Sequence, residues 1–227
     1  MPDHYYTQTP TSAHKPGQVD FLWRGAKLVF ETDSGVFSRT EIDKGTEILL
    51  NALPEELTGS LLDMGCGYGV IGVTLGKRYP GLSVVMSDVN ERAVELSRRN
   101  AQRNGVQNAE FFCGDAGQAA RSLREQGLTP DVVVVDPPRK GLSPDVIRVL
   151  AQMSPRKIAY ISCDPATLAR DVALLKEQGF RLLGARAVDM FPRCAHVETV
   201  VLLSKGGVES KKVRVEFSLE DMDMSDF

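Results

Sequence analysis

The alternation of short apolar segments with amphipathic segments, which begins at residue 60, most strongly limits how this chain can fold. The spacing predicts strands at 60–64, 83–87, 109–113, 131–136, 157–162, 181–189 and 196–203. It predicts helices at 69–79, 90–104, 115–126, 143–153 and 165–178. Strands separated by helices of this length predict an α/β fold with a doubly wound, mostly parallel sheet of seven strands. No helix separates the last two strands, so we expect them to pair antiparallel.

The segments outside this alternation predict smaller additions. Alternating apolar residues over 19–32 predict a hairpin, in which we expect Phe21 and Trp23 to pack as core, and 42–53 reads as a short amphipathic helix. The tail after Lys205 is polar and acidic, and we expect it not to pack. The chain therefore divides into an arm, hairpin and helix at 1–57, a main domain at 58–205 and a tail at 206–227.

Composition excludes several classes of protein. No apolar run approaches the roughly 20 residues that span a bilayer, and the N-terminus lacks an apolar signal core, so we expect a cytoplasmic protein without membrane contact. A net charge of −3 is not typical of a strong nucleic-acid binder. The cysteines form no Cys-x-x-Cys pair, so neither a metal site nor a disulfide framework is expected. They are Cys66, Cys113, Cys163 and Cys194.

A glycine-rich loop joins the first core strand to its helix. It runs from Asp63 to Gly69, and glycines there let the backbone turn tightly and approach a ligand. Asp88 ends the second strand, where a carboxylate accepts hydrogen bonds from ribose hydroxyl groups, and Asp115 follows the third, within reach of an adenine amino group. The segment Gly67–Gly72 also fits the dinucleotide pattern G-x-G-x-x-G, which is a weak signal alone.

A thiol and two carboxylates stand at the ends of later strands. Asp136 opens the turn Asp-Pro-Pro-Arg-Lys-Gly, Cys163 comes 27 residues later between a strand and a helix, and Glu198 lies 35 residues beyond Cys163. Strand ends of this kind meet at one edge of an α/β sheet. A thiol beside two carboxylates indicates covalent chemistry on a flat, electron-poor ring.

The aspartate before a Gly-x-Gly-x-Gly loop, with Asp-Pro-Pro after the fourth strand, resembles the class I methyltransferases that use S-adenosyl-L-methionine. The resemblance implies a Rossmann-like fold with helices on both faces of the sheet, and it favours this cofactor over NAD. The residues it implies for cofactor binding are Asp63, Gly65, Cys66, Gly67, Gly69, Asp88, Asp115 and Asp136.

Two narrower resemblances divide the chain near residues 100–110, so that it reads as a hybrid. Residues 27–100 resemble small-subunit rRNA guanine-N2 methyltransferases, through Ser34–Arg39, Asp43-Lys44-Gly45 and the glycine loop. That family follows its fourth strand with Asn-Pro-Pro and an aromatic residue, from which Asp136-Pro137-Pro138-Arg139 departs.

Residues 105–205 resemble the RNA uracil-C5 methyltransferases, which form 5-methyluridine. The matching segments are Asp136–Gly141, Ser162–Asp171, Asp189–Pro192 and His196–Glu198, with Asp164 in place of the commoner Asn. Larger relatives carry an RNA-binding barrel and many carry a four-cysteine iron–sulfur site, and neither pattern is seen in this sequence.

The second resemblance implies the catalytic roles. Cys163 is the nucleophile that adds to uracil C6, Glu198 is the base that removes the C5 proton, and Asp136 hydrogen-bonds the flipped base. The implied partner is rRNA or tRNA, while the oligomeric state stays open. Two alternatives are a cofactor-binding domain without catalysis and a guanine-N2 methyltransferase. The roles of Cys163 and Glu198 each also have a structural alternative. Cys163 would then be a small buried hydrophobic residue, and Glu198 a solvent-facing strand residue.

Overall fold

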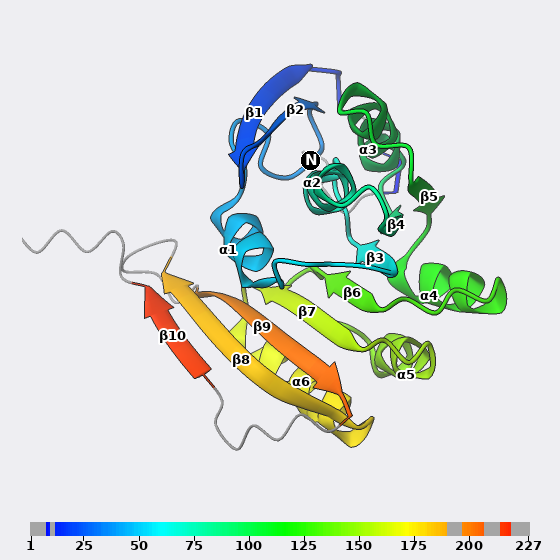
Figure 1. Cartoon of the computed structure of the whole chain (residues 1–227), viewed down its shortest axis with the longest axis vertical. Coiled ribbons are helices and arrows are strands. Elements are labelled where there is room, and N and C mark those ends of the chain that lie inside the picture. The colour runs from blue at the N-terminus through cyan, green and yellow to red at the C-terminus, as the bar shows by residue number, and fades with distance from the viewer. Residues whose placement is uncertain (1–7, 10–11, 190–196, 207–213, 219–227) are drawn as a thin grey trace, which may run out of the picture.

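The computed structural model describes residues 8–9, 12–189, 197–206 and 214–218. Its main feature is a sheet with the strand order β10-β8-β9-β7-β6-β3-β4-β5, in which β9 alone among the described strands runs against its neighbours (Figure 1). The strands are β3 (Ser60–Met64), β4 (Ser83–Asp88), β5 (Ala109–Cys113), β6 (Val132–Val135), β7 (Lys157–Ser162), β8 (Phe180–Asp189), β9 (Val197–Lys205) and β10 (Arg214–Ser218).

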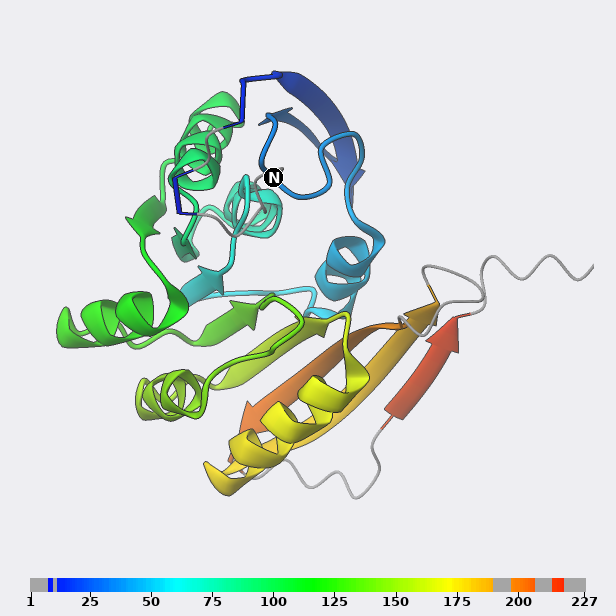
Figure 2. The same cartoon turned by 180° about the vertical axis from the view of Figure 1, so that it is seen from behind.

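Helices cover both faces of this sheet and build two apolar cores (Figures 1 and 2). One core lies under α1 (Lys44–Ala52), α2 (Val70–Arg78) and α3 (Glu91–Arg103). The other lies under α4 (Ala116–Glu125), α5 (Pro144–Gln152) and α6 (Pro165–Glu177). The valines of β6 alternate between the cores, because successive side chains of a strand point to opposite faces.

The strand order places a crevice at the centre of the sheet. From β3 the chain continues to β4 and β5 on one side, and β6 and β7 then form on the other side of β3. The loops that follow β3 and β6 therefore diverge, and ligands of open α/β sheets bind at such a switch point. Because β9 is reversed, its first residues lie at the same edge as the last residues of β7.

The N-terminal hairpin packs on α2 and α3. It consists of β1 (Gly17–Trp23) and β2 (Ala26–Thr32). Two asparagines of α3 complete the edge of β2, since Asn100 and Asn104 accept from the backbone N–H groups of Glu31 and Val29 at 2.7 and 3.0 Å. Trp23 is buried in the core and donates to Asn51, so its predicted core role is confirmed.

The predicted fold is confirmed, with one addition. The sequence predicted an unpacked tail after Lys205, and this is wrong for Arg214–Ser218, which forms β10 along β8. Its residues Arg-Val-Glu-Phe-Ser alternate polar and apolar, a short strand pattern that the prediction of a polar tail overlooked. Cys194 and His196 lie outside the described residues, as do Met190–Pro192 and residues 219–227. No helix in the described ranges is long and apolar enough to cross a membrane.

Candidate functional site

The glycine loop joins β3 to α2 at the crevice. Gly69 is the N-cap of α2 with a φ of 92°, and a Cβ there would lie 2.9 Å from that of Ser97 in α3. Only glycine meets both conditions without strain. The cap provides no side-chain hydrogen bond. The N–H group of Gly72 already donates to Asp63, so the N–H groups that precede it in α2 are the ones that suit an anionic group of a ligand, such as a carboxylate.

The loop leaves room for a cofactor and holds an acidic partner beside it. No atom lies within 4 Å of the point where a Cβ on Gly67 would stand. The N–H groups of Gly67 and Asn90 each donate to one oxygen of Asp88, both at 2.8 Å. The backbone of Val89 also contributes a hydrogen bond, and the carboxylate still keeps a lone pair for a hydroxyl group. The open loop, the uncapped helix and Asp88 together fit S-adenosyl-L-methionine.

Asp115 has a structural task that sequence reasoning did not assign. It caps α4, and its Oδ1 accepts from the N–H groups of Gly117 and Gln118 at 2.8 and 2.9 Å. The side chain is exposed. Contact of its second oxygen with adenine stays a prediction.

Two buried groups lie behind the loop. Asp63 accepts from the N–H group of Gly72 at 3.0 Å, and burial together with the charge of Asp88 raises its pKa to about 7. Cys66 is buried, and burial followed by the charges of Asp88 and Asp63 raises the pKa of its thiol well above the usual value. Cys66 is therefore a poor nucleophile, as a buried cysteine usually is.

A segment of the front half closes over the loop. The hydroxyl group of Tyr68 donates to the carbonyl oxygen of Ser38 at 3.0 Å, and the amide of Asn90 donates to that of Gly35 at 2.9 Å. These bonds hold the segment Ser34–Arg39 against the crevice. The function of this segment was missed by sequence reasoning, which used it only as a family signature.

Asp136 stands on the other side of the crevice. Its N–H group donates to the carbonyl oxygen of Met64 at 3.2 Å, next to the glycine loop. The residue is exposed, so it lies at the solvent-facing end of β6 rather than in the core. Crowding by protein, followed by the charges of Glu198 and Asp43, raises the pKa of its carboxyl group well above the usual value.

The register of β7 and β9 brings the predicted nucleophile and base together. Ser162 pairs with Thr199, so one step further Cys163 stands opposite Glu198. Both residues are half-buried, and the charge of Glu198 acts on the Cys163 thiol. The three predicted catalytic residues, Asp136, Cys163 and Glu198, thus lie at adjoining strand ends.

Charges around this cluster change its proton affinities. Burial and then the charge of Asp43 raise the pKa of Glu198 to about 7. Burial and the charge of Glu198 raise the pKa of Cys163, against which a hydrogen bond and the positive charge of Arg139 act. Glu198 is therefore poised to exchange a proton near neutral pH, and Arg139 is the group that favours the thiolate.

A buried carboxylate ties the turn after β6 to α6. Asp171 accepts from the N–H group of Leu142 at 2.7 Å and from the hydroxyl group of Tyr160 at 2.6 Å. Arg170 donates to Asp171 at 2.7 Å and to the carbonyl oxygen of Lys140 at 2.8 Å. The turn that carries Arg139 is therefore fixed relative to the start of α6, directly after Cys163.

The first turn of α1 also lies at this cluster, and sequence reasoning did not predict its position there. Asp43 caps α1, and the position of a Cβ on Gly45 would lie 2.9 Å from Cγ of Glu198. The sequence signal was present as Asp43-Lys44-Gly45 before an amphipathic helix. It could not reveal the contact, because Glu198 is more than 150 residues away.

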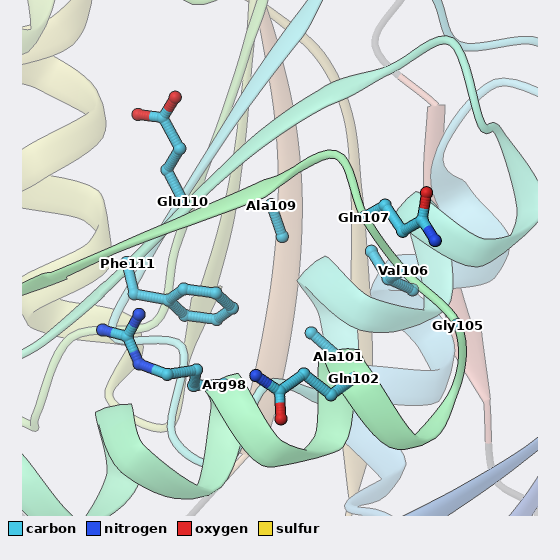
Figure 3. A pocket seen from close by; sticks show the side chains of 9 residues that line it. All are labelled: Arg98, Ala101, Gln102, Gly105, Val106, Gln107, Ala109, Glu110 and Phe111. Atoms are coloured by element: carbon cyan, nitrogen blue, oxygen red, sulfur yellow. The ribbon is translucent and has the colours of Figure 1, made fainter.

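A hollow of about 760 Å³ lies elsewhere, between α3 and the edge strand β5 (Figure 3). Arg98 and Phe111 face each other in it, with the guanidinium carbon 4.8 Å from the ring centroid. None of the predicted site residues lines this hollow. In the described part of the chain, no group of three or more His, Cys, Asp or Glu side chains is arranged to hold a metal ion.

The fold and the loop define a methyltransferase. The chain belongs to the methyltransferase small domain family, whose model matches residues 27–156. An uncharacterized RNA methyltransferase of Enterococcus faecalis (strain ATCC 700802 / V583) is 44% identical over 185 residues, 78% of this chain and 39% of the relative. One of Clostridium tetani (strain Massachusetts / E88) is 40% identical over 170 residues, 73% and 36% respectively.

Two similar solved structures come one from each of the two families that the sequence resembles. The Pyrococcus abyssi tRNA (uracil-54, C5)-methyltransferase with S-adenosyl-L-homocysteine has a TM-score of 0.65 and 33% identity, over 81% of this chain and 44% of that one. A T. thermophilus 16S rRNA guanine-N2 methyltransferase with AdoMet and guanosine has a TM-score of 0.65 over 87% and 52%; its 23% identity supports the fold alone.

These comparisons confirm the family resemblance and S-adenosyl-L-methionine as the cofactor. The chain spans about two fifths of the length of the curated relatives it matches. The Enterococcus alignment is longer than either of the two resembling segments, so it runs from one into the other. The change of resemblance near residues 100–110 therefore falls within one continuous fold.

Proposed function

We propose that this protein transfers a methyl group from S-adenosyl-L-methionine to C5 of a uridine in rRNA or tRNA. The observation that supports this most is the convergence of Cys163, Glu198 and Asp136 at adjoining strand ends beside the glycine loop. The similar Pyrococcus abyssi protein is a tRNA (uracil-54, C5)-methyltransferase, which is consistent with the same reaction. When bound, the cofactor supplies an electrophilic methyl group.

Cys163 begins the reaction. Its thiolate adds to C6 of uracil, forming an S–C6 bond and moving the C5–C6 electron pair toward the C4 carbonyl oxygen, which makes C5 nucleophilic. The bound cofactor would supply the methyl group to this activated C5 and would leave as the neutral thioether. Because burial raises the pKa of this thiol, the nearby Arg139 supplies the positive charge that stabilises the thiolate.

Glu198 completes the reaction. Its carboxylate removes the proton from C5, the electron pair re-forms the C5–C6 double bond, and the S–C6 bond breaks to release the Cys163 thiolate. A pKa of about 7 suits this task, because a base works best when its pKa lies near the working pH. The proton then leaves from Glu198 to solvent.

Asp136 is suited to recognise the base. Its carboxyl group accepts hydrogen bonds and, when protonated, also donates one, and the raised pKa favours that form at higher pH than usual. Uracil presents a carbonyl and an N–H group side by side on its pairing edge, which is the complementary pattern. The base reaches the crevice only if it is unstacked or single-stranded.

Nucleoside mass spectrometry tests the proposal. Unmodified rRNA and tRNA are incubated with the protein and methyl-labelled cofactor, and labelled 5-methyluridine is the expected product. Cys163→Ala is expected to abolish this product while cofactor binding, measured by calorimetry, stays within about twofold of the parent. Product formation by Cys163→Ala would contradict the mechanism.

Two other outcomes point to the alternatives. Labelled N2-methylguanosine would indicate the chemistry of the front-half resemblance, which needs no thiol. No labelled nucleoside, with cofactor binding confirmed in the same sample, would indicate a binding domain without catalysis. Either result would replace the uracil proposal.

A further inference from the structure

The first turn of α1 and Glu198 share one small space. A Cβ on Gly45 would lie 2.9 Å from Cγ and 3.2 Å from Oε1 of Glu198, and 3.0 Å from Oδ2 of Asp43. The first distance is shorter than Cβ atoms show in practice. The carboxyl group of Glu198 therefore packs against the backbone of α1 where any other residue would have a side chain.

Glycine at this position is not explained by the helix itself. Gly45 lies inside α1, where alanine is the better helix former. It is not among the residues with a positive φ. Glycine at position 45 is explained by the space that it leaves for the side chain of Glu198.

Asp43 adds a charge to the same space. It caps α1 by accepting from the N–H group of Thr46 at 3.2 Å, which fixes its carboxylate beside the helix end. Burial and Asp43 raise the pKa of Glu198, in that order of size. The other charged or titratable groups around Glu198 come from every neighbouring element. They are Lys44 of α1, Asp136 and Arg139 after β6, Cys163 after β7, and Arg186, which the β8–β9 register places on the face of Glu198.

We propose that the first turn of α1, through Gly45 and Asp43, positions the carboxylate of Glu198 for removal of the C5 proton and sets the pH at which it works. Gly45 and Asp43 are positioning residues that act through Glu198. The inference rests on the function proposed above. It also assigns a task in the back-half reaction to the front-half motif Asp43-Lys44-Gly45.

Gly45→Ala tests the positioning. The added methyl group must displace Glu198, so proton removal slows while thiol addition and methyl transfer continue. We expect label from the cofactor to collect in a denaturant-stable protein–RNA adduct, and release of 5-methyluridine to fall about 10- to 100-fold. Gly81→Ala is the matched control, because its Cβ meets no atom within 4 Å, and it should match the parent.

A double variant separates positioning from general damage. Glu198→Ala removes both Cγ and the carboxylate oxygen that lie close to the Cβ position of Gly45. Adding Gly45→Ala to Glu198→Ala should therefore change the residual release less than about threefold, against about 10-fold or more in the parent background. Equal losses in both backgrounds would overturn the inference.

Asp43→Asn tests the charge. Asparagine caps helices as well as aspartate does, so α1 should persist while the negative charge beside Glu198 is lost. The pH midpoint for product release should move to lower pH, because the deprotonated base is then easier to form. An unchanged or higher midpoint would contradict this part of the inference.

The results distinguish failure of the positioning inference from failure of the proposed function. If the parent protein releases labelled 5-methyluridine and Gly45→Ala matches it in release and adduct, the positioning inference alone fails. If the parent forms neither product nor adduct, while cofactor binding is intact, both the inference and the proposed function fail.

Discussion

The hydroxyl group of Tyr160 donates a 2.6 Å hydrogen bond to Asp171, and solvent reaches neither side chain. Asp171 also accepts from the backbone of Leu142 and pairs with Arg170. β7, α6 and the turn after β6 therefore meet at one buried negative charge. Since Cys163 lies between β7 and α6, this charge fixes Cys163 relative to the turn that carries Asp136.

Tyr160→Phe should destabilise the protein by about 1–3 kcal/mol, because it removes a donor from a buried carboxylate. Urea unfolding gives the free energy. Tyr79→Phe is the matched control: its hydroxyl group donates to the carbonyl oxygen of Glu55 at 2.6 Å in an exposed setting, where water replaces it. The control should lose less than about 1 kcal/mol. Equal losses would contradict the buried role of Tyr160.

Gly141→Ala should be more costly than a positive φ alone explains. Gly141 has a φ of 71°, and its Cβ would stand 2.4 Å from Oδ2 of Asp171. Gly25 has a φ of 80° with no atom within 4 Å, so Gly25→Ala measures only the backbone cost, about 1–2 kcal/mol. We expect thermal unfolding to show the larger loss for Gly141→Ala. A loss no greater than that of Gly25→Ala would show that the buried carboxylate moves aside freely.

The release of methylated product should depend on pH through Glu198. The base works only when deprotonated, and its pKa is raised to about 7, so the release rate should rise with pH and level off above about 7. Glu198→Gln should slow release about 10²- to 10⁴-fold and remove this inflection. Single-turnover measurements from about pH 5 to about pH 9 would show both. An inflection that survives in Glu198→Gln would assign the base to another residue.

Asp63 should make the stability of the cofactor-free protein depend on pH. Its pKa is raised from 3.8 to about 7, so the folded state holds a proton that the unfolded state has lost across this range. This stabilisation is present below about pH 4 and is lost as the pH rises through about 7. Asp63→Asn should remove part of that decline, about 2–4 kcal/mol across the range. Parallel stability curves for parent and variant would show that Asp63 does not titrate there.

The arrangement of the sheet could be predicted because its signals are local. Each core strand is a short apolar run that ends at a turn residue, and α4, α5 and α6 begin at the capping residues Asp115, Ser143 and Asp164. The strand β10 was missed because its five alternating residues stand alone in a polar tail, where so short a pattern is a weak signal, and its pairing with β8 emerges only in the structure.

Only the part of the candidate site that lies at strand ends could be predicted from the sequence. The convergence of Cys163, Asp136 and Glu198 follows from the positions of β6, β7 and β9 in the sheet. The contacts of Asp43 and Gly45 with Glu198 depend on how α1 packs across the sheet face. No periodicity in the sequence encodes that packing, so these residues emerge only in three dimensions.

The residue spacing along the reversed strand β9 decides on which face of the sheet the carboxylate of Glu198 lies. Glu198 faces α1 because it lies two residues before Val200, which points into the core under α1. Inserting or deleting one residue between Glu198 and Val200 would turn the carboxylate toward the opposite face, under α4, α5 and α6. Insertions beyond Lys205 leave the alternation of side chains along β9 unchanged. The proposed chemistry thus tolerates length variation after β9 and forbids a one-residue change between Glu198 and Val200.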